Sequence, residues 1–359
     1  MQWYPLKLTT PLARHAFGGE RLETQLGKAV DVSQRVAESW EVSDVTGSRA
    51  TIENGELAGT SLHELFETRT EALMGENWQG PPHFPLLFKF IDATGMLPVH
   101  VHADDDTARR LKLWPHGKTE AWHILWAEPG ATLLLGVKPG VDREQLRTKL
   151  REQDYDAVMQ RYPIRTGNTF YVPAGTLHSF GPGVLLGEIQ QTADIQEQAM
   201  PWAMEDGEPI DQAQWESNID ATVEQVNLDQ QSEPNPGLSL HASEGVERRF
   251  CCAGPYFAME RITFVERYRR RFSRPQLLSN LSEPIEVTWS GGSMTLPRAE
   301  TLLLPAALGE VELRGRGDVL INYEPNLETD VIAPLRQAGY SEREIHRLGD
   351  VEKRYAKGY

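Results

Sequence analysis

The sequence predicts a mainly β protein made of jelly-roll domains, with helices added at their edges. Three observations support this fold class. Short apolar segments separated by turn residues recur through most of the chain, which is typical of a β-sandwich or jelly roll. Helical periodicity is sparse in the middle of the chain. A polar segment with proline and glycine, residues 228–242, separates one β-rich stretch from a second.

The expected strands are short, and several alternate apolar with polar residues. The alternation is clear at Val311 and Leu313 and again at Val319 and Ile321, where every second side chain would face a core. Strands are expected at residues 84–92, 121–127, 131–138, 169–173, 183–190, 255–265, 285–289 and 310–323.

The expected helices lie at the edges of these strand-rich stretches. Residues 61–74 carry apolar residues at helical spacing, with Ser61 as the N-cap and Glu64 completing a capping box. Further helices are expected at 142–160, at 210–226 and at 327–349, the last as two short helices with Ser341 capping the second.

These patterns predict two β-rich domains. Residues 1–228 would form a domain with helical insertions, residues 229–242 a linker, and residues 243–359 a smaller β-rich domain with a helical tail. Metal-ligand motifs occur only in the first stretch, so we expect only the first domain to bind a metal.

Composition and charge exclude several classes of protein. The 359 residues carry a formal net charge of −16, which disfavours non-specific binding to nucleic acid or to an anionic membrane. No apolar run reaches the roughly 20 residues that span a bilayer. The N-terminus lacks the pattern of a secretion signal. Two adjacent cysteines make no disulfide framework, so a cytoplasmic protein is expected.

Three histidines and a glutamate carry the strongest chemical signal. His100 and His102 are two apart, so on a strand their side chains point to one face. Glu120 begins another apolar strand, and His178 follows a strand and a Pro-Ala-Gly turn. Three imidazoles and one carboxylate suit zinc, iron, manganese, cobalt or nickel, and the remaining open positions on the metal would favour catalysis.

These half-motifs resemble those of the cupin superfamily, whose double-stranded β-helix binds a metal inside the barrel. More narrowly, the chain resembles type I phosphomannose isomerases of the compact bacterial kind, from about residue 4 to 325. The resemblance implies a metal-dependent aldose–ketose isomerase, usually with zinc, acting on mannose 6-phosphate and fructose 6-phosphate. It is carried by Phe17-Gly18-Gly19, by residues 38–43 and 84–92, by Val101–Asp105, Gly117–Glu120 and Tyr171–His178, and by Glu188-Ile189-Gln190-Gln191.

The chain departs from the family pattern at two positions. The family's first metal ligand is normally glutamine, and here it is His100. The family has an arginine ten residues after the glutamate that matches Glu188, and here that place is Gln198. An arginine offers a fixed charge and a planar fork of donors, whereas glutamine offers one amide. We therefore expect weak or absent turnover of the phosphosugar unless another cation, among Lys118, Arg109, Arg110 and Arg165, takes over.

The resemblance also suggests catalytic residues. Lys118 matches a family lysine two residues before the glutamate ligand, and Gln198 occupies the place of the arginine. Glu188, Asp104 and Glu38 are further candidates for moving a proton between adjacent carbons.

Three other functions stay open at this point. One is an isomerase or epimerase of an unphosphorylated or modified sugar, which the loss of the arginine favours. Another is an iron-dependent cupin oxygenase, which the set of three histidines and one glutamate favours. The third is a sugar-binding cupin without catalysis. If the protein is an isomerase, its binding partner is a small sugar or a sugar phosphate.

Overall fold

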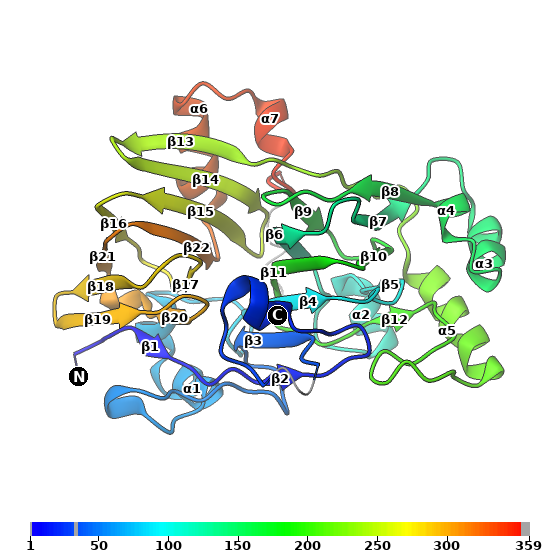
Figure 1. The fold of residues 1–359 in the computed structure, drawn as a ribbon, viewed down its shortest axis with the longest axis horizontal. Coiled ribbons are helices and arrows are strands. Elements are labelled where there is room, and N and C mark those ends of the chain that lie inside the picture. Colours follow the sequence, from blue (N-terminus) through cyan, green and yellow to red (C-terminus); the bar gives the residue numbers. More distant parts are fainter. Residues whose placement is uncertain (1, 32–34, 353–359) are drawn as a thin grey trace.

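The computed structural model describes residues 2–31 and 35–352 and divides them into four antiparallel sheets (Figure 1). Two sheets form the half that contains the histidines. The six-stranded sheet contains, in order, β2 (Leu12–Ala13), β3 (Glu38–Val42), β4 (Leu86–Ala93), β11 (Val184–Gln191), β6 (Glu120–Ala127) and β9 (Thr169–Val172). The five-stranded sheet contains β12 (Glu197–Gln198), β5 (His100–Val101), β10 (His178–Phe180), β7 (Thr132–Val137) and β8 (Met159–Pro163).

The other two sheets form the second half, at the left of Figure 1. The seven-stranded sheet contains β1 (Leu6–Lys7), β20 (Thr301–Leu304), β17 (Gln276–Asn280), β22 (Gly317–Tyr323), β15 (Ala258–Phe264), β14 (Val246–Ala253) and β13 (Leu238–Ser243). The four-stranded sheet contains β16 (Arg267–Arg271), β21 (Glu310–Arg314), β18 (Ile285–Trp289) and β19 (Gly292–Leu296). The mainly β fold class is confirmed.

Helices lie at the edges of the sheets, as expected. The Ser61 hydroxyl accepts a hydrogen bond from the Glu64 amide at the start of α1, and Ser341 caps α7 in the same way. The α-helices are α1 (Leu62–Met74), α2 (Asp105–Leu111), α3 (Arg143–Arg151), α4 (Tyr155–Val158), α5 (Gln212–Gln225), α6 (Ala333–Gln337) and α7 (Glu342–His346). Shorter helical turns are η1 (Leu22–Leu26), η3 (Gly55–Leu57), η4 (Ala306–Leu308) and η5 (Leu327–Ile332).

Two details of the predicted domain map are wrong. The segment 229–242 is not all linker, because β13 begins at Leu238 and pairs with β14. Leu238 and Leu240 pack against the apolar core of the second half, which explains why the strand forms. At the other end of the chain, β1 does not belong to the first half, because Leu6 pairs with Leu303 of β20.

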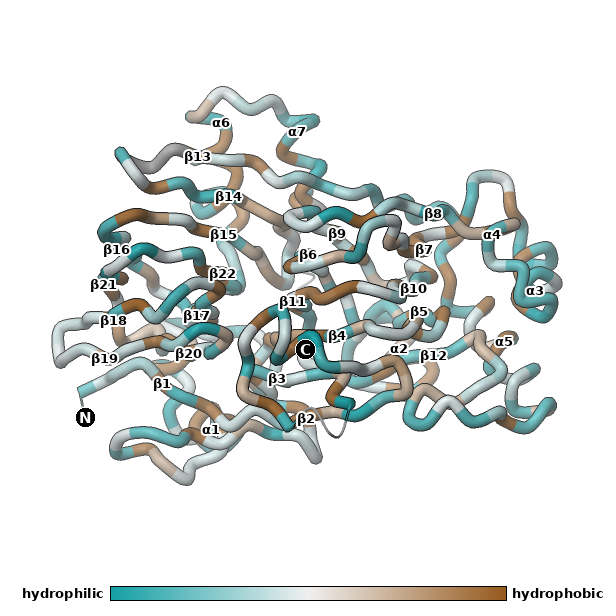
Figure 2. Tube along the Cα trace, in the orientation of Figure 1, coloured by the Kyte–Doolittle hydropathy of each residue, from teal (hydrophilic) through white to brown (hydrophobic). Residues whose placement is uncertain are grey.

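Separate apolar cores fill the two halves, and a third joins them. Figure 2 shows hydrophobic residues concentrated along the inner strands of both halves. The joining core contains Phe88 and Ile189 from the six-stranded sheet together with Cys251, Leu277 and Leu303 from the seven-stranded sheet. The six-stranded sheet, which carries Glu120 and Glu188, is therefore supported from behind by the second half. None of the helices in the described part of the chain is both long and apolar enough to span a bilayer.

Candidate metal centre and cavity

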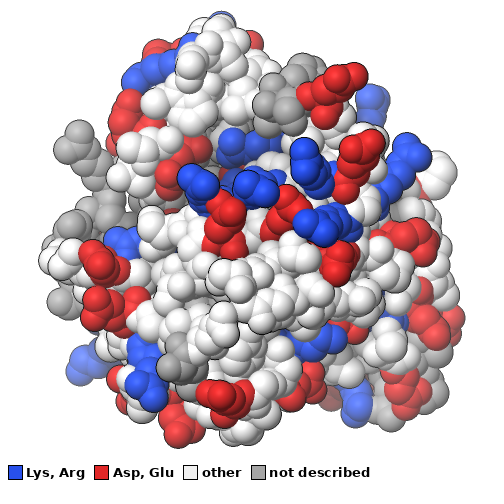
Figure 3. Space-filling model, turned by 90° about the vertical axis from the view of Figure 1, so that its left-hand side faces the viewer, with Lys and Arg blue, Asp and Glu red and all other residues white. Residues whose placement is uncertain are grey.

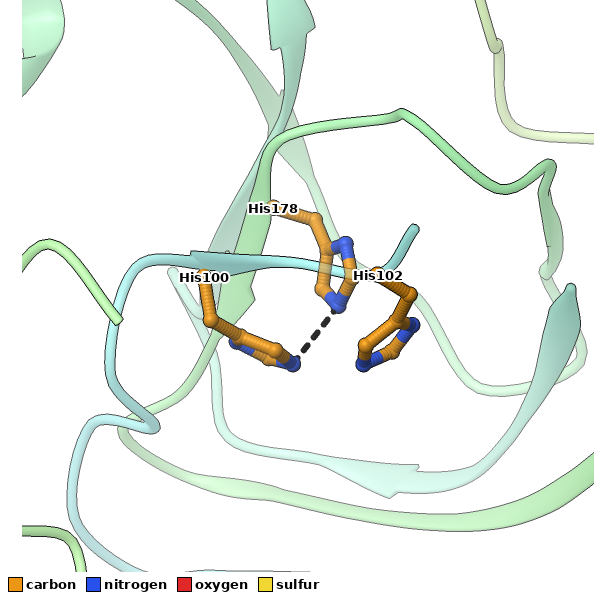
Figure 4. Close-up of side chains that lie close together, drawn as sticks. All are labelled: His100, His102 and His178. Carbon is orange, nitrogen blue, oxygen red and sulfur yellow. Dashed lines mark hydrogen bonds between the residues drawn. The ribbon is translucent and has the colours of Figure 1, made fainter. Parts of the chain in front are cut away.

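The three predicted histidines meet inside the first half of the molecule. His100 on β5 and His178 on β10 are paired directly across two antiparallel strands, and His102 follows β5. All three side chains are buried, and one ring nitrogen from each lies within 4.8 Å of the other two. Figure 4 shows the three rings converging on one point. The spacing of two residues puts His100 and His102 on one face, as expected for an extended chain.

Backbone contacts fix the protonation of two of these rings. The Nδ1 atoms of His100 and His178 lie 2.8 Å from the carbonyl oxygens of Pro98 and Thr176. A carbonyl only accepts, so each Nδ1 must carry the proton and each Nε2 a lone pair. These two Nε2 atoms face each other at 2.8 Å, the contact dashed in Figure 4. Two lone pairs at this distance repel unless a cation lies beside them.

The pKa values show that a proton does not supply that cation at neutral pH. Burial lowers the pKa of His178 to about 3 and lowers the pKa of His100 well below its usual value. Burial also holds the pKa of His102 well below normal, helped by the charge of Lys118. All three rings are therefore neutral at pH 7, which is the form that binds metals.

Glu120 extends the same cluster. One carboxylate oxygen lies 3.4 Å from His102 Nδ1 and the other lies 3.3 Å from His178 Nε2. The Trp122 indole donates a hydrogen bond to Glu120 Oε1, and the Lys118 ammonium lies 3.1 Å from Oε2. Glu120 thus contacts two of the histidines, and its place as a fourth metal ligand stays a prediction.

The donor set fits a divalent transition metal. His102 Nε2 is buried and forms no hydrogen bond within the described residues. Buried polar atoms normally find a partner, so a nitrogen without one, in a cluster of imidazole and carboxylate groups, is suited to binding a cation. Imidazole nitrogens with a carboxylate are suitable ligands for such an ion.

A buried lysine beside this cluster was not predicted. Lys89 lies in the middle of β4 and is 4% exposed. Its ammonium lies 3.1 Å from Glu38 and 3.7 Å from Glu188, over the ring of Trp40. The signal in the sequence was a single lysine inside the apolar run Phe84-Pro85-Leu86-Leu87-Phe88-Lys89-Phe90-Ile91, a position that normally excludes a charge unless it is paired.

The two carboxylates around Lys89 have opposite pKa shifts. Burial alone would raise the pKa of Glu38, but Lys89 and His15 oppose burial and bring it down to about 2. Burial and the neighbouring Glu120 raise the pKa of Glu188 to about 7. Glu188 also accepts a hydrogen bond from the Trp122 indole. Glu38 is therefore a fixed negative charge, while Glu188 can gain or lose a proton near neutral pH.

These groups surround a cavity of about 530 Å³. It is lined by His100 and by both buried lysines, Lys89 and Lys118. The acidic residues that line it are Glu38, Glu120, Glu188, Asp194, Glu197 and Glu205. Among the residues that the structure describes, no arginine lines the cavity, and the cavity volume is in the range of small-molecule sites.

The other predicted residues lie outside this cluster. Asp104 caps α2 by accepting a hydrogen bond from the Thr107 amide. Arg109 and Arg110 pair with Asp106 and Glu224 at the surface. Of the four cations expected to replace the missing arginine, only Lys118 lines the cavity.

Gln198 lies next to the histidines but does not line the cavity. It pairs with His100 across β12 and β5, so the two side chains leave the same face of the sheet. Its neighbours Asp194, Gln196 and Glu197 form that part of the cavity wall instead. The exposed Arg165 is also absent from the lining.

Comparison with known proteins gives consistent matches. A family model described as "Phosphomannose isomerase type I, catalytic domain" matches residues 6–120. The mannose-6-phosphate isomerase of Streptococcus mutans is 26% identical over 321 residues, which is 89% of this chain and 98% of that protein. The mannose-6-phosphate isomerase ManA of Bacillus subtilis is 28% identical, over 81% of this chain and 90% of that protein.

A solved structure shares the fold. The crystal structure of the mannose 6-phosphate isomerase from Bacillus subtilis matches with a TM-score of 0.80 at 22% identity. The match covers 89% of this chain and 99% of that one. The arrangement of sheets in this chain is thus shared with that structure over most of its length.

Proposed function

The chain belongs to the type I phosphomannose isomerase family, and from this premise we propose that it interconverts mannose 6-phosphate and fructose 6-phosphate through an enediol. The observation that carries the proposal is the cluster of facing histidine lone pairs beside a cavity with two buried lysines and Glu188. The sequence relatives that match along most of the chain are sugar isomerases, which supports the same reaction class.

We propose that His100, His102, Glu120 and His178 hold one divalent metal ion, with zinc as the first candidate. Iron, manganese, cobalt and nickel are the alternatives that the same ligands suit. When bound, such an ion supplies a Lewis acid that polarises the oxygens of the sugar. The residues around it must then bind the sugar, exclude water and move a proton.

Glu188 is the proposed carrier of the proton. Isomerisation between an aldose and a ketose removes a proton from one carbon and returns one to the neighbouring carbon. A group with a pKa near 7 can do both at neutral pH. The pKa of Glu188 is about 7, and Lys89 holds its carboxylate in place.

Lys118 is the proposed source of positive charge at the reacting oxygens. Its ammonium is buried next to Glu120 and lines the cavity. A fixed charge where negative charge develops typically contributes a large share of catalysis. Gln198 on the neighbouring strand is neutral and does not line the cavity, so the reaction should be slower than with an arginine there.

An unphosphorylated sugar is the second candidate substrate. Within the described part of the chain no arginine lines the cavity, and both lysines that line it are already paired with carboxylates. Asp194, Glu197 and Glu205 add negative charge. A neutral sugar would not be repelled by this wall, whereas a phosphate dianion would be. The net charge of −16 disfavours nucleic-acid and membrane partners, and a cytoplasmic location stays a prediction.

Parallel assays with the metal-loaded protein test the proposal. We expect conversion of mannose 6-phosphate to fructose 6-phosphate, and less conversion of mannose to fructose. Turnover of the free sugars alone would instead select the second candidate. If the metal site is fully loaded and neither mannose 6-phosphate, fructose 6-phosphate, mannose nor fructose is converted, the proposed isomerase activity is refuted. Iron as the native metal together with oxygen consumption would identify an oxygenase.

A further inference from the structure

A second cavity, of about 650 Å³, lies in the half of the molecule that has no metal motif. Its walls are formed by side chains from β14, β16, β17 and β22, and η5 and α6 close one side. It shares no lining residue with the cavity beside the histidines, among the residues that the structure describes. Neither the family match nor the proposed reaction assigns it a role.

Two arginines in this cavity share a single carboxylate. Glu260 is completely buried, and its Oε2 accepts from Arg248 Nε at 2.9 Å while its Oε1 accepts from Arg270 Nη1 at 2.9 Å. The Tyr323 hydroxyl donates a third hydrogen bond to Glu260. Two guanidinium groups are always charged, and one carboxylate balances only one of them. This group of residues therefore carries an excess positive charge.

The two guanidinium groups are held in place and still have donors to offer. Arg270 donates to the Gln276 side chain from Nε and Nη2, and it lies over the ring of Tyr323. Arg248 uses Nε and Nη2 on Glu260, while its Nη1 forms no hydrogen bond within the described residues. Arg248 is partly buried, with 22% of its side chain exposed, so its Nη1 donors can reach a ligand that enters the cavity.

The exposed arginines of the four-stranded sheet are paired differently from Arg248 and Arg270. Figure 3 shows basic and acidic side chains side by side at the end of the molecule that carries β16 and β18. Arg269 and Arg314 both pair with Glu312, and Arg271 pairs with Glu310. Arg269 and Arg271, which also line the cavity, are thus each matched by a carboxylate of the neighbouring strand, whereas Arg248 and Arg270 share the one carboxylate of Glu260.

Other charged residues that line the cavity do not cancel this excess. Arg274 donates to the backbone carbonyl of Met74 and adds a further positive charge. Asp330 accepts from the Asn326 amide, and burial raises the pKa of Glu324 to about 7. Neither carboxylate forms an ion pair with Arg248 or Arg270 within the described part of the chain.

We infer that this cavity of the second β unit is a binding site for a small oxyanion, a phosphate group that is either free or part of a small metabolite. Arg248 and Arg270 would hold it through charge-assisted hydrogen bonds, with Tyr268 and Gln276 as polar neighbours. The site does not depend on the metal centre and stands whether or not the proposed isomerase reaction is correct.

Calorimetric titration of the metal-loaded, full-length protein tests the site with inorganic phosphate and, in parallel, with glycerol 1-phosphate. We expect saturable binding that Arg248→Gln weakens roughly tenfold to a hundredfold, the usual effect of losing a charge-assisted hydrogen bond. Arg314→Gln removes the same charge from the outer surface and should leave the affinity unchanged. Tighter binding of glycerol 1-phosphate than of phosphate would identify a phosphorylated metabolite as the ligand.

A second variant keeps the test decisive if Arg248→Gln does not fold. Arg248→Lys retains the charge but not the planar fork, so it should fold and still bind phosphate more weakly. Phosphate bound at the metal cavity would persist in both variants as a separate site. Equal affinity and stoichiometry in the wild type and Arg248→Lys, or no saturable binding in the wild type, would overturn the inference and leave the two arginines with a structural role only.

Discussion

At the level of single residues, the candidate site combines side chains that the sequence pattern reveals with others that it hides. His100, His102, Glu120 and His178 stand out because their spacing and turn residues are unusual together. Lys89 and Trp40 do not stand out, because their partners are distant in the chain and only the sheet brings them together. The sequence alone does not show that Lys89 lines the cavity. Nor does it show that Arg109, Arg110 and Arg165 lie outside it.

The buried Glu38–Lys89 pair should stabilise the fold strongly and in a pH-dependent way. Glu38→Gln leaves the Lys89 charge without its closest partner, which typically costs about 3–5 kcal/mol of unfolding free energy. The pKa of Glu38 falls from 4.5 to about 2 on folding, so its contribution is complete above about 4.5 and is lost as the pH falls toward 2. Urea unfolding at several pH values measures this.

The Lys7–Glu300 pair, which is partly exposed to solvent, provides the control for that measurement. Glu300→Gln breaks an ion pair of similar length at the surface and should cost less than about 1 kcal/mol. Equal unfolding free energies for Glu38→Gln and the wild type at pH 7 would show that the buried pair does not stabilise the fold.

Restoring an arginine at position 198 should increase turnover of the phosphosugar. Gln198 pairs with His100, so an arginine there would leave the same face of the sheet and bring a charge toward the reacting oxygens. A preorganised charged donor is often worth a factor of about 10²–10³ in rate, and we expect Gln198→Arg to recover at least roughly tenfold in kcat.

Gln214→Arg makes the same change on the exposed face of α5 and serves as the control. It should leave kcat for mannose 6-phosphate unchanged. A kcat for Gln198→Arg at or below that of the wild type would mean that the lysines already supply the charge that the reaction needs.

At the level of secondary-structure elements, local patterns predicted well what local interactions decide. The helix at 61–74 forms where its spacing and capping residue place it, and the helix expected at 210–226 forms as α5. The helix α2 was missed, because its seven residues carry mostly charged side chains and only Ala108 is buried. The strand β13 was missed because its polar composition resembles a linker, while its packing against the second core is a tertiary effect.

The loop that precedes Glu120 is held by close packing at Gly117. A Cβ atom at this position would lie 2.5 Å from the Ala103 carbonyl oxygen and 2.6 Å from the Asp104 carbonyl carbon. Gly117→Ala should therefore push this loop away from the turn after His102, lower metal occupancy, and destabilise the fold by about 1–3 kcal/mol. Elemental analysis and thermal unfolding measure both effects.

Gly187→Ala is the matched control, on β11 beside Glu188. There the nearest atoms are side-chain carbons at 3.3 Å, which can shift slightly to make room. The Gly187→Ala variant should have the same metal occupancy as the wild type. Full metal occupancy in Gly117→Ala would show that the loop position is not what holds Glu120 near the histidines.

At the level of the whole molecule, the two halves are joined more closely than the sequence suggests. The polar stretch before β13 marks the change from one half to the other. Composition alone, however, does not reveal that β1 pairs with β20, which lies nearly 300 residues later in the chain. Local patterns carry no information about strand partners. The shared core behind β4 and β11 means that the second half supports the sheet carrying Lys89 and Glu188.

The central claim is that one metal ion held by the histidine cluster makes this chain a sugar isomerase. The most direct test removes the metal with a chelator, confirms by elemental analysis that it is gone, and titrates zinc back while following conversion of mannose 6-phosphate to fructose 6-phosphate. We predict that turnover rises in proportion to bound zinc, levels off at one ion per chain, and is absent in His102→Ala but present in His346→Ala. Undiminished turnover in the metal-free protein would contradict this account.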